Sequence, residues 1–306
     1  MTLSQAQHSY KYMIIDGKKL ANSITTHLKK EIDEGLAKGW EAPKLVIFSV
    51  KPTEEISTYV QNKQKKFHEI GGISKVVLFK KTPRFEEFMA KLATFTLDPT
   101  TSGVIIQLPM PPALGTMTLM DYIPDKKEIE GFKKKTLFDP PVGLAVLTML
   151  KSVFAPVDYD NPESVIVDVA RDIQLFKSVL KRKKVVVLGR GMTGGQPVGA
   201  ALSKCKINYI NVNSQTPHPE EYLEQADIII SCVGKTIIKP EHVKPGAVLI
   251  SVGLHKEGSS WKGDYVDREI EHSALAYSPT PGGVGPLTVA YLLANVVKAW
   301  KMHNQE

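Results

Sequence analysis

Along this chain, segments in which hydrophobic residues recur at helical spacing alternate with short continuous hydrophobic runs. Apolar residues recur every four positions from Leu20 to Ile32, which predicts a helix, and an apolar run at 45–50 predicts a buried strand. The alternation continues with helices at 53–70 and 85–97 and strands at 75–79 and 103–107. Short apolar strands separated by helices are typical of βαβ units and a mostly parallel sheet. The first half of the chain is therefore predicted to be an α/β domain.

A second series of strands begins at Lys184 and has a Rossmann-like order. Strands are predicted at 185–188, 207–212, 226–232 and 247–252, with a helix at 196–204. Before them, Asn161-Pro162 has the pattern of a helix start and 169–180 carries an apolar stripe, so one extra helix is predicted there. The final helix, from Leu287 to about 303, is expected to return to the first domain.

These elements predict two domains, the first of them discontinuous. It would comprise residues 1–150 together with 281–306, the extra helix would form an inserted linker at 155–182, and a Rossmann-type domain would span 183–280.

The segment Pro281-Gly-Gly-Val-Gly-Pro286 lies directly before the final helix. Its glycines leave no side chain between the backbone and a ligand, and its two prolines stiffen it. A rigid open loop of this kind suits a flat ligand that approaches closely. An ordinary glycine-rich turn is the alternative.

Glycines also follow the first strand of the second series. Gly189, Gly191 and Gly194 match G-x-G-x-x-G between a strand and a helix, where the backbone turns tightly and a pyrophosphate can approach the helix N-terminus. A tight turn without a ligand is the alternative. The next strand ends in Asn213 and Ser214 without the carboxylate usual for NAD, and Arg190 could meet a 2′-phosphate. This pattern favours NADP.

Composition indicates which classes of ligand and partner the chain can bind. The 306 residues carry a net charge of +7, which favours anionic ligands. Basic runs at 133–135 and 181–184 lack any accompanying nucleic-acid motif, so no nucleic-acid partner is predicted. The histidines are scattered, so no metal is predicted, and two distant cysteines indicate thiols in a reducing compartment.

The N-terminal eleven or so residues are expected to be a loose polar extension without an apolar signal core. The apolar runs are too short to cross a bilayer, so no membrane partner is predicted. A cytoplasmic location is expected.

Tyr59 and Lys63 are four residues apart on a predicted helix and therefore share a face. A ring and an amine on one face can hold a flat heterocycle and transfer a proton. A solvated lysine beside Lys65 and Lys66 is the alternative. Gln107 ends a predicted strand, where its amide could orient a ligand or satisfy backbone groups at the sheet edge.

Six segments in the right order resemble the bifunctional methylenetetrahydrofolate dehydrogenase/methenyltetrahydrofolate cyclohydrolase family. They are 14–21, 57–65, 106–109, 186–190, 244–247 and 279–290. The resemblance covers nearly the whole chain, and the segments around Lys63 and Pro281 are its most specific parts.

The resemblance implies a folate-binding catalytic domain and an NADP-binding Rossmann-type domain with a cleft between them. Tyr59 would stack on the pterin side of the folate, Lys63 would be the catalytic amine, Gln107 would tune it, and Glu130 would contact the pterin. Further folate contacts are implied for Val60, Ile106, Leu108, Pro281, Gly282, Gly283, Val284 and Gly285. NADP contacts are implied for Gly189, Arg190, Gly191, Ser214 and Leu254.

The implied reaction oxidises 5,10-methylenetetrahydrofolate with NADP to the 5,10-methenyl form and hydrolyses this to 10-formyltetrahydrofolate. The family further implies one-carbon metabolism, purine biosynthesis, tetrahydrofolate substrates that can be polyglutamylated, and a homodimer.

Several positions depart from the family pattern. Glu130 stands where the family has aspartate, and its extra methylene displaces the carboxylate by about an ångström. Gly191 replaces a serine, Ser251 replaces an aspartate, and the segment 138–143 lacks a hydroxyl. Two alternatives therefore stay open: a dehydrogenase with an impaired cyclohydrolase step, and a catalytically silent folate- or nucleotide-binding regulator. Retention of Lys63 argues against the silent protein.

Overall fold

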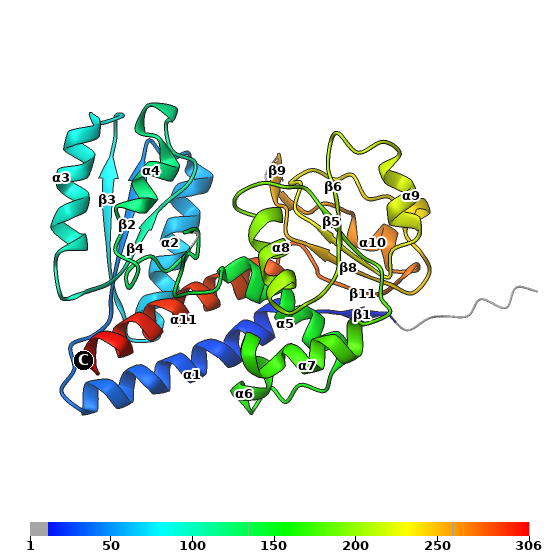
Figure 1. Ribbon diagram of the computed structural model, residues 1–306, viewed down its shortest axis with the longest axis horizontal. Coiled ribbons are helices and arrows are strands. Elements are labelled where there is room, and N and C mark those ends of the chain that lie inside the picture. Colours follow the sequence, from blue (N-terminus) through cyan, green and yellow to red (C-terminus); the bar gives the residue numbers. More distant parts are fainter. Residues whose placement is uncertain (1–11, 134, 259, 306) are drawn as a thin grey trace, which may run out of the picture. The chain divides into compact units, whose positions relative to one another are not determined.

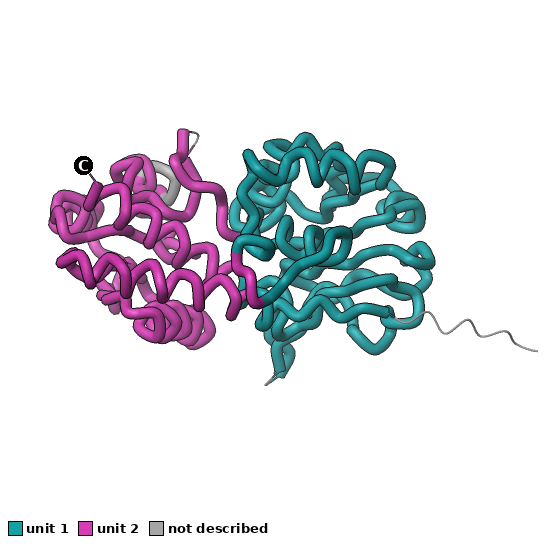
Figure 2. Tube along the Cα trace, turned by 90° about the horizontal axis from the view of Figure 1, so that it is seen from below, with its two compact units in different colours: residues 1–20, 142–159, 163–287 teal, residues 21–141, 160–162, 288–306 magenta. Residues whose placement is uncertain are grey.

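The computed structural model describes residues 12–133, 135–258 and 260–305. The chain divides into two compact units, shown in Figure 2. Of the described residues, those within 12–20, 142–159 and 163–287 belong to unit 1, and those within 21–141, 160–162 and 288–305 belong to unit 2. Each unit has its own parallel sheet.

Unit 2 is built on a three-stranded sheet in the order β3-β2-β4. Its strands are β2 (Lys44–Val50), β3 (Ile73–Phe79) and β4 (Thr101–Ile106), and both pairings are parallel. Helix α2 (Glu54–Glu69) connects β2 to β3, and α3 (Phe85–Thr96) connects β3 to β4. The two crossovers run in opposite directions along the sheet, so right-handed connections put the helices on opposite faces. Figure 1 shows α2 and α3 on either side of the strands.

One face of this sheet packs against α3 and the segment after β4. Alternate residues of β2, Val46, Phe48 and Val50, share a buried core with Phe88 and Leu92 of α3. The segment after β4 contains a 3₁₀ turn (Pro112–Leu114) and α4 (Thr116–Asp121). Because both faces of β2 are covered, it has the continuous apolar run that the sequence showed.

Two long helices start in unit 1 and lie mostly in unit 2. Helix α1 spans Gly17–Ala37 and α11 spans Val284–Asn304, and they run side by side in Figure 1. The Trp300 indole donates to the carbonyl of Glu41 at 2.7 Å, and Lys301 pairs with Glu31 at 2.6 Å. A side chain at Gly35 would meet the Trp300 ring at 2.1 Å, so glycine allows this close packing.

Unit 1 is built on a six-stranded sheet in the order β1-β11-β8-β7-β5-β6, with every neighbouring pair parallel. The strands are β1 (Met13–Ile14), β5 (Val185–Leu188), β6 (Ile210–Val212), β7 (Ile228–Ser231), β8 (Ala247–Ser251) and β11 (Ala274–Tyr277). The chain goes from β5 to β6 on one side and returns to β7 on the other. A ligand is therefore expected at the carboxyl end of β5, where the strand order reverses.

Helices and a small hairpin surround this sheet. The helices are α5 (Pro141–Phe154), α6 (Pro162–Val165), α7 (Val169–Leu180), α8 (Gly195–Lys204), α9 (Pro219–Glu224), a 3₁₀ turn (Pro240–His242) and α10 (Asp267–Ile270). The hairpin pairs β9 (His255–Glu257) with β10 (Ser260–Lys262). In the described part of the chain, no helix has the combination of length and apolar character that crossing a membrane requires.

The structure corrects two expected elements. The single helix predicted from Asn161 to Leu180 is wrong, because α6 and α7 are separate. Asp168 has extended backbone angles and its carboxylate accepts the Arg171 N–H at 2.8 Å, so it caps α7 and ends continuity with α6. The final helix begins at Val284 and not at Leu287, so the second half of the glycine-rich segment is helical.

Candidate active site

Helix α2 places Tyr59 and Lys63 one turn apart. The helix starts at Thr53, whose hydroxyl accepts the Ile56 N–H, and acidic residues in its first turn favour its N-terminus. The Lys63 amine lies 4.8 Å from the centre of the Tyr59 ring, so the predicted shared face is confirmed. Only 4% of Lys63 is exposed, which excludes the alternative of a solvated lysine.

Gln107 holds the Lys63 amine from the neighbouring strand. It directly follows β4, and its backbone N–H donates to Phe48 of β2 at 2.8 Å. Its side-chain Nε2 donates to the carbonyl of Leu108 at 3.0 Å, which turns Oε1 toward Lys63. Lys63 Nζ donates to this oxygen at 3.0 Å, as the resemblance implied.

Glu130 lies in a loop that its own residue Glu128 and two other segments, β4 and α11, hold in place. The backbone N–H of Glu130 donates to the buried Glu128 carboxylate at 3.0 Å. Lys127 accepts from Val104 of β4 at 2.9 Å, and Asn295 of α11 donates to the carbonyl of Ile129 at 2.8 Å. The loop conformation therefore depends on residues far apart in the sequence.

Burial shifts the pKa values of Lys63 and Glu130 in opposite directions, toward one another. It lowers the pKa of Lys63, and the negative charge of Glu130 opposes that shift. Burial of the Glu130 carboxyl raises its pKa to about 7, with Lys63 opposing the rise and Glu128 adding to it. Burial, with the charge of Glu130, raises the pKa of Tyr59 to about 12, so this ring stays neutral. Burial thus brings the pKa of the amine and the pKa of the acid closer together than in water.

The other predicted contacts in unit 2 have little exposed side chain. Val60 is 4% exposed and Ile106 is 1% exposed, and Leu108 packs at the edge of the core. Contacts to a ligand from Val60 and Ile106 would therefore be made mainly by their backbone.

In unit 1, a glycine-rich turn at residues 189–195 follows the carboxyl end of β5 and is called here the nucleotide turn. Gly189 has φ +96° and donates to the carbonyl of Val212 at 2.8 Å. A Cβ on Gly195 would lie 2.1 Å from the Gly189 carbonyl oxygen, so the turn closes only with glycine at position 195. By contrast, a Cβ on Gly191 meets nothing within 4 Å. The motif did not single out Gly195, although the Gly194-Gly195 doublet signals it.

Exposed polar groups surround this turn. The Arg190 guanidinium is exposed and donates to Gln215 at 3.2 Å, and Ser214 is also exposed. Asn211 donates to the Gly189 carbonyl at 2.8 Å, which joins the end of β6 to the turn. Leu254, 49% exposed, follows β8. Closely packed glycines, open space at Gly191 and the exposed Arg190 cation fit a phosphorylated dinucleotide.

The glycine-rich segment after β11 is tightly packed at one glycine and open at another. Pro281 follows a cis peptide bond and Gly282 has φ +111°. A Cβ on Gly283 would lie 2.6 Å from the Pro279 carbonyl oxygen, whereas one on Gly285 meets nothing within 4 Å. The Val284 side chain is buried and a Cβ on Gly282 would contact Lys18 at 3.5 Å, so Gly285 is the open position.

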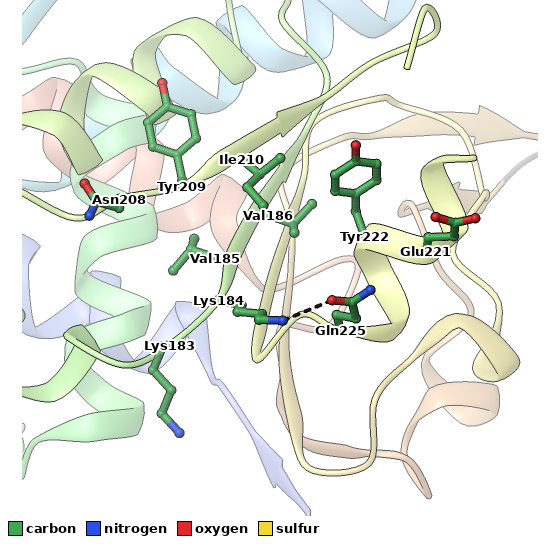
Figure 3. Close-up of a pocket in the computed structure, with 10 residues that line it drawn as sticks. All are labelled: Lys183, Lys184, Val185, Val186, Asn208, Tyr209, Ile210, Glu221, Tyr222 and Gln225. Atoms are coloured by element: carbon green, nitrogen blue, oxygen red, sulfur yellow. Dashed lines mark hydrogen bonds between the residues drawn. The ribbon is translucent and has the colours of Figure 1, made fainter. Parts of the chain in front are cut away.

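A hollow of about 450 Å³ lies elsewhere, beside the edge strand β6 (Figure 3). Lys184, Val185 and Ile210 line it, at the amino ends of β5 and β6. The nucleotide turn follows the opposite end of β5, and none of the predicted site residues line this hollow. Among the described residues, no group of three or more His, Cys, Asp or Glu side chains is arranged to hold a metal ion.

Comparisons with known proteins assign both parts of the chain. A family model described as the catalytic domain of tetrahydrofolate dehydrogenase/cyclohydrolase matches residues 15–130. The model of the same family's NAD(P)-binding domain matches residues 162–304. The chain belongs to the tetrahydrofolate dehydrogenase/cyclohydrolase family.

Relatives extend this assignment over almost the full length. The chain is 34% identical to the bifunctional protein FolD of Geobacillus thermodenitrificans over 291 residues, which are 94% of this chain and 96% of that protein. It is 32% identical to FolD of Listeria innocua, over 95% and 99% of the two chains. Among solved structures, FolD of Campylobacter jejuni is 26% identical with a TM-score of 0.83 and covers 96% of this chain and 100% of its own.

The family assignment gives meaning to the departures noted in the sequence. A serine at position 191 would meet no atom within 4 Å through its Cβ, so the backbone does not require glycine there. The Ser251 hydroxyl accepts the Asp264 N–H at 2.9 Å and donates to the Gly253 carbonyl at 3.2 Å. Ser251 is thus part of a buried network behind the nucleotide turn.

Proposed function

We propose that this enzyme oxidises 5,10-methylenetetrahydrofolate to the 5,10-methenyl form with NADP and hydrolyses that product to 10-formyltetrahydrofolate. The observation that carries this proposal is the buried Lys63 amine between the Gln107 amide and the Tyr59 ring, with Glu130 as its charged neighbour. A family member that only bound folate would have no use for an amine buried at this cost.

In the first step, the substrate itself supplies most of the electronic stabilisation. The lone pairs of N5 and N10 stabilise the methenyl cation that hydride loss leaves. NADP, when bound, accepts the hydride. The protein aligns the two ligands: Tyr59 offers a ring face to the pterin, and the glycine turn of unit 1 offers backbone N–H groups to the pyrophosphate.

In the second step, water attacks the cationic methenyl carbon and the bond from that carbon to N5 breaks. Lys63 takes the first proton that the water loses on attack. The remaining hydroxyl proton passes to N5 as the C=O bond forms and the ring opens, which leaves the formyl group on N10. Burial of Lys63 increases the neutral fraction of its amine at a given pH, which suits a proton acceptor. Gln107 fixes the direction of the amine.

We propose NADP over NAD on two features of unit 1. The segment 210–216, which contains β6 and the four residues after it, carries no carboxylate to bind ribose hydroxyls. The exposed Arg190 offers a planar cation to a 2′-phosphate.

The cellular setting follows from this activity. We propose a cytoplasmic homodimer that acts on tetrahydrofolate derivatives, including polyglutamylated ones, and supplies 10-formyltetrahydrofolate to purine biosynthesis. The net positive charge favours such polyanionic substrates.

Three assays on the purified chain test the proposal. Methylenetetrahydrofolate is supplied with NADP, then with NAD, and methenyltetrahydrofolate is supplied alone. We expect methenyl formation faster with NADP than with NAD, and hydrolysis of supplied methenyltetrahydrofolate above the uncatalysed rate. Methenyl formation without hydrolysis would favour the impaired cyclohydrolase, for which the longer side chain of Glu130 is the candidate cause. Binding without either reaction would contradict the proposal and leave a silent regulator.

A further inference from the structure

Asp264, which follows β10, is a carboxylate with no exposed surface. Its Oδ1 accepts the N–H groups of Gly234 at 2.7 Å and Lys235 at 3.0 Å, and its Oδ2 accepts that of Val233 at 3.2 Å. A buried carboxylate requires donors of this kind, and three consecutive backbone N–H groups supply them. The carboxylate therefore determines the conformation of the segment 233–235, called here the β7 loop because it follows β7.

The β7 loop is joined to the nucleotide turn through Cys232. The Cys232 N–H donates to Leu188, the last residue of β5, at 2.8 Å. A Cβ on Gly189 would lie 3.1 Å from the Cys232 carbonyl oxygen, and one on Gly194 would lie 3.0 Å from the Cys232 Cβ. At these separations, a displacement of the β7 loop displaces the turn as well.

The segment after β8 packs closely on the same carboxylate. A Cβ on Gly253 would lie 2.2 Å and 2.4 Å from the two oxygens of Asp264 and 2.3 Å from the Gly234 nitrogen. The next residue is Leu254, and it is exposed, as is Val233 in the β7 loop. Asp264 thus holds together two backbone segments that carry exposed apolar side chains beside the nucleotide turn.

We propose that Asp264 is a positioning residue for the dinucleotide: it holds the β7 loop and Leu254 in the arrangement that receives NADP. This inference rests on the proposed function. Asp264 is buried behind the loop and acts through it. It is therefore needed for the NADP-dependent step and not for hydrolysis, which uses Lys63 of unit 2 and no dinucleotide.

The variant Asp264→Asn tests whether Asp264 is needed for the NADP-dependent step and not for hydrolysis. It replaces one acceptor oxygen by an NH₂ group, so the three N–H bonds of the β7 loop cannot all form. We expect kcat/KM for NADP to fall about 10- to 100-fold, mostly through KM. Hydrolysis of supplied methenyltetrahydrofolate should stay within about twofold of wild type.

Asp227→Asn is the matched control. Asp227 also accepts a backbone N–H, that of Lys184 at 2.8 Å, and pairs with Lys244 at 2.7 Å, but it lies at the other end of β7. The variant Asp227→Asn should lower the stability of the same unit and leave the β7 loop unchanged. The KM of this variant for NADP should therefore equal that of wild type.

Ser251→Ala is a milder second variant, because the Ser251 hydroxyl accepts the Asp264 N–H. If Asp264→Asn is not recovered folded, Ser251→Ala should show a smaller rise in KM for NADP together with unchanged hydrolysis. An unchanged KM in the folded variant, or equal losses in both activities, would overturn the inference. Failure of wild type in both assays would instead contradict the proposed function itself.

Discussion

At the residue scale, Lys63 and Glu130 control each other's charge. Burial disfavours the charged form of both, whereas the attraction between their opposite charges favours it. The pair therefore titrates as a unit, and removing one charge must move the proton affinity of the other.

The variant Glu130→Gln tests this coupling. The negative charge of Glu130 raises the pKa of Lys63, so its removal should lower that pKa further. If neutral Lys63 accepts the proton from water, the rising limb of the pH profile of hydrolysis then shifts to lower pH. Below about pH 7 the wild-type carboxyl is itself protonated, so the two profiles should converge there. The measurement is kcat for methenyltetrahydrofolate hydrolysis against pH.

Glu130→Asp is the control for the loss of charge. It keeps the carboxylate and shortens the side chain to the length found in the family. Its profile should retain the wild-type position. A Glu130→Gln profile that does not move, or moves to higher pH, would contradict proton transfer to Lys63.

Sequence spacing predicted which residues share a face but not how buried they are. The four-residue interval placed Tyr59 and Lys63 together, and the structure confirms this. The burial of Lys63 depends on Gln107 and on the loop around Glu130, which join α2 only in the folded unit. Gly195 was missed for a similar reason: the Gly194-Gly195 doublet marks the position, but the close approach of a carbonyl oxygen to it exists only in the folded turn.

At the element scale, the β5–α8 turn depends on Gly195. Alanine favours a helix over glycine, so Gly195→Ala would stabilise α8 if only propensity mattered. The clash at 2.1 Å with the Gly189 carbonyl outweighs that gain, and we expect a net loss of at least about 1–3 kcal/mol. Urea unfolding measures the loss, and NADP titration should show weakened binding.

Gly191→Ala is the comparison for this turn. Its Cβ meets nothing within 4 Å, so its unfolding free energy should match that of wild type. Equal stability of all three proteins would show that the turn does not need glycine at position 195.

Helix α11 anchors the loop that carries Glu130. Asn295, 6% exposed, donates to the carbonyls of Ile129 at 2.8 Å and Asp139 at 3.0 Å. Asn295→Ala leaves two buried carbonyls without this donor, and we expect a loss of about 1–3 kcal/mol in unfolding free energy. The KM for methylenetetrahydrofolate should rise because Glu130 is less well held. Asn295→Gln keeps the donor and should recover part of both losses; a KM equal to wild type in Asn295→Ala would contradict the anchoring role.

Periodicity predicted most elements but not the interruptions between them. The stripe at 169–180 was visible, whereas the break before it arises from the Asp168 side chain binding the Arg171 N–H. The start of α11 at Val284 was hidden by glycines and a proline, which usually indicate a loop. The predicted strand at 207–212 is shorter in the structure, since only Ile210–Val212 pair with β5.

At the scale of the whole molecule, the proposed catalytic amine and the proposed dinucleotide site belong to different units. Lys63, Gln107 and Glu130 are in unit 2, and the nucleotide turn and Asp264 are in unit 1. The alternation of strands and helices predicted an α/β fold with a Rossmann-type second part, because period and order are local properties of a sequence. How both chain ends contribute helices to unit 2 depends on long-range packing, such as Trp300 against Glu41.

The central claim is that one chain performs both steps and that the Lys63 amine serves the second. The most direct test follows methenyltetrahydrofolate optically after mixing methylenetetrahydrofolate and NADP with wild type or with Lys63→Met. In wild type, the methenyl form should appear and decay to 10-formyltetrahydrofolate. In Lys63→Met, the account predicts that it forms at a measurable rate and accumulates, because hydrolysis falls on the order of 10²–10⁴-fold. Decay of the methenyl form at the wild-type rate in Lys63→Met would contradict the account.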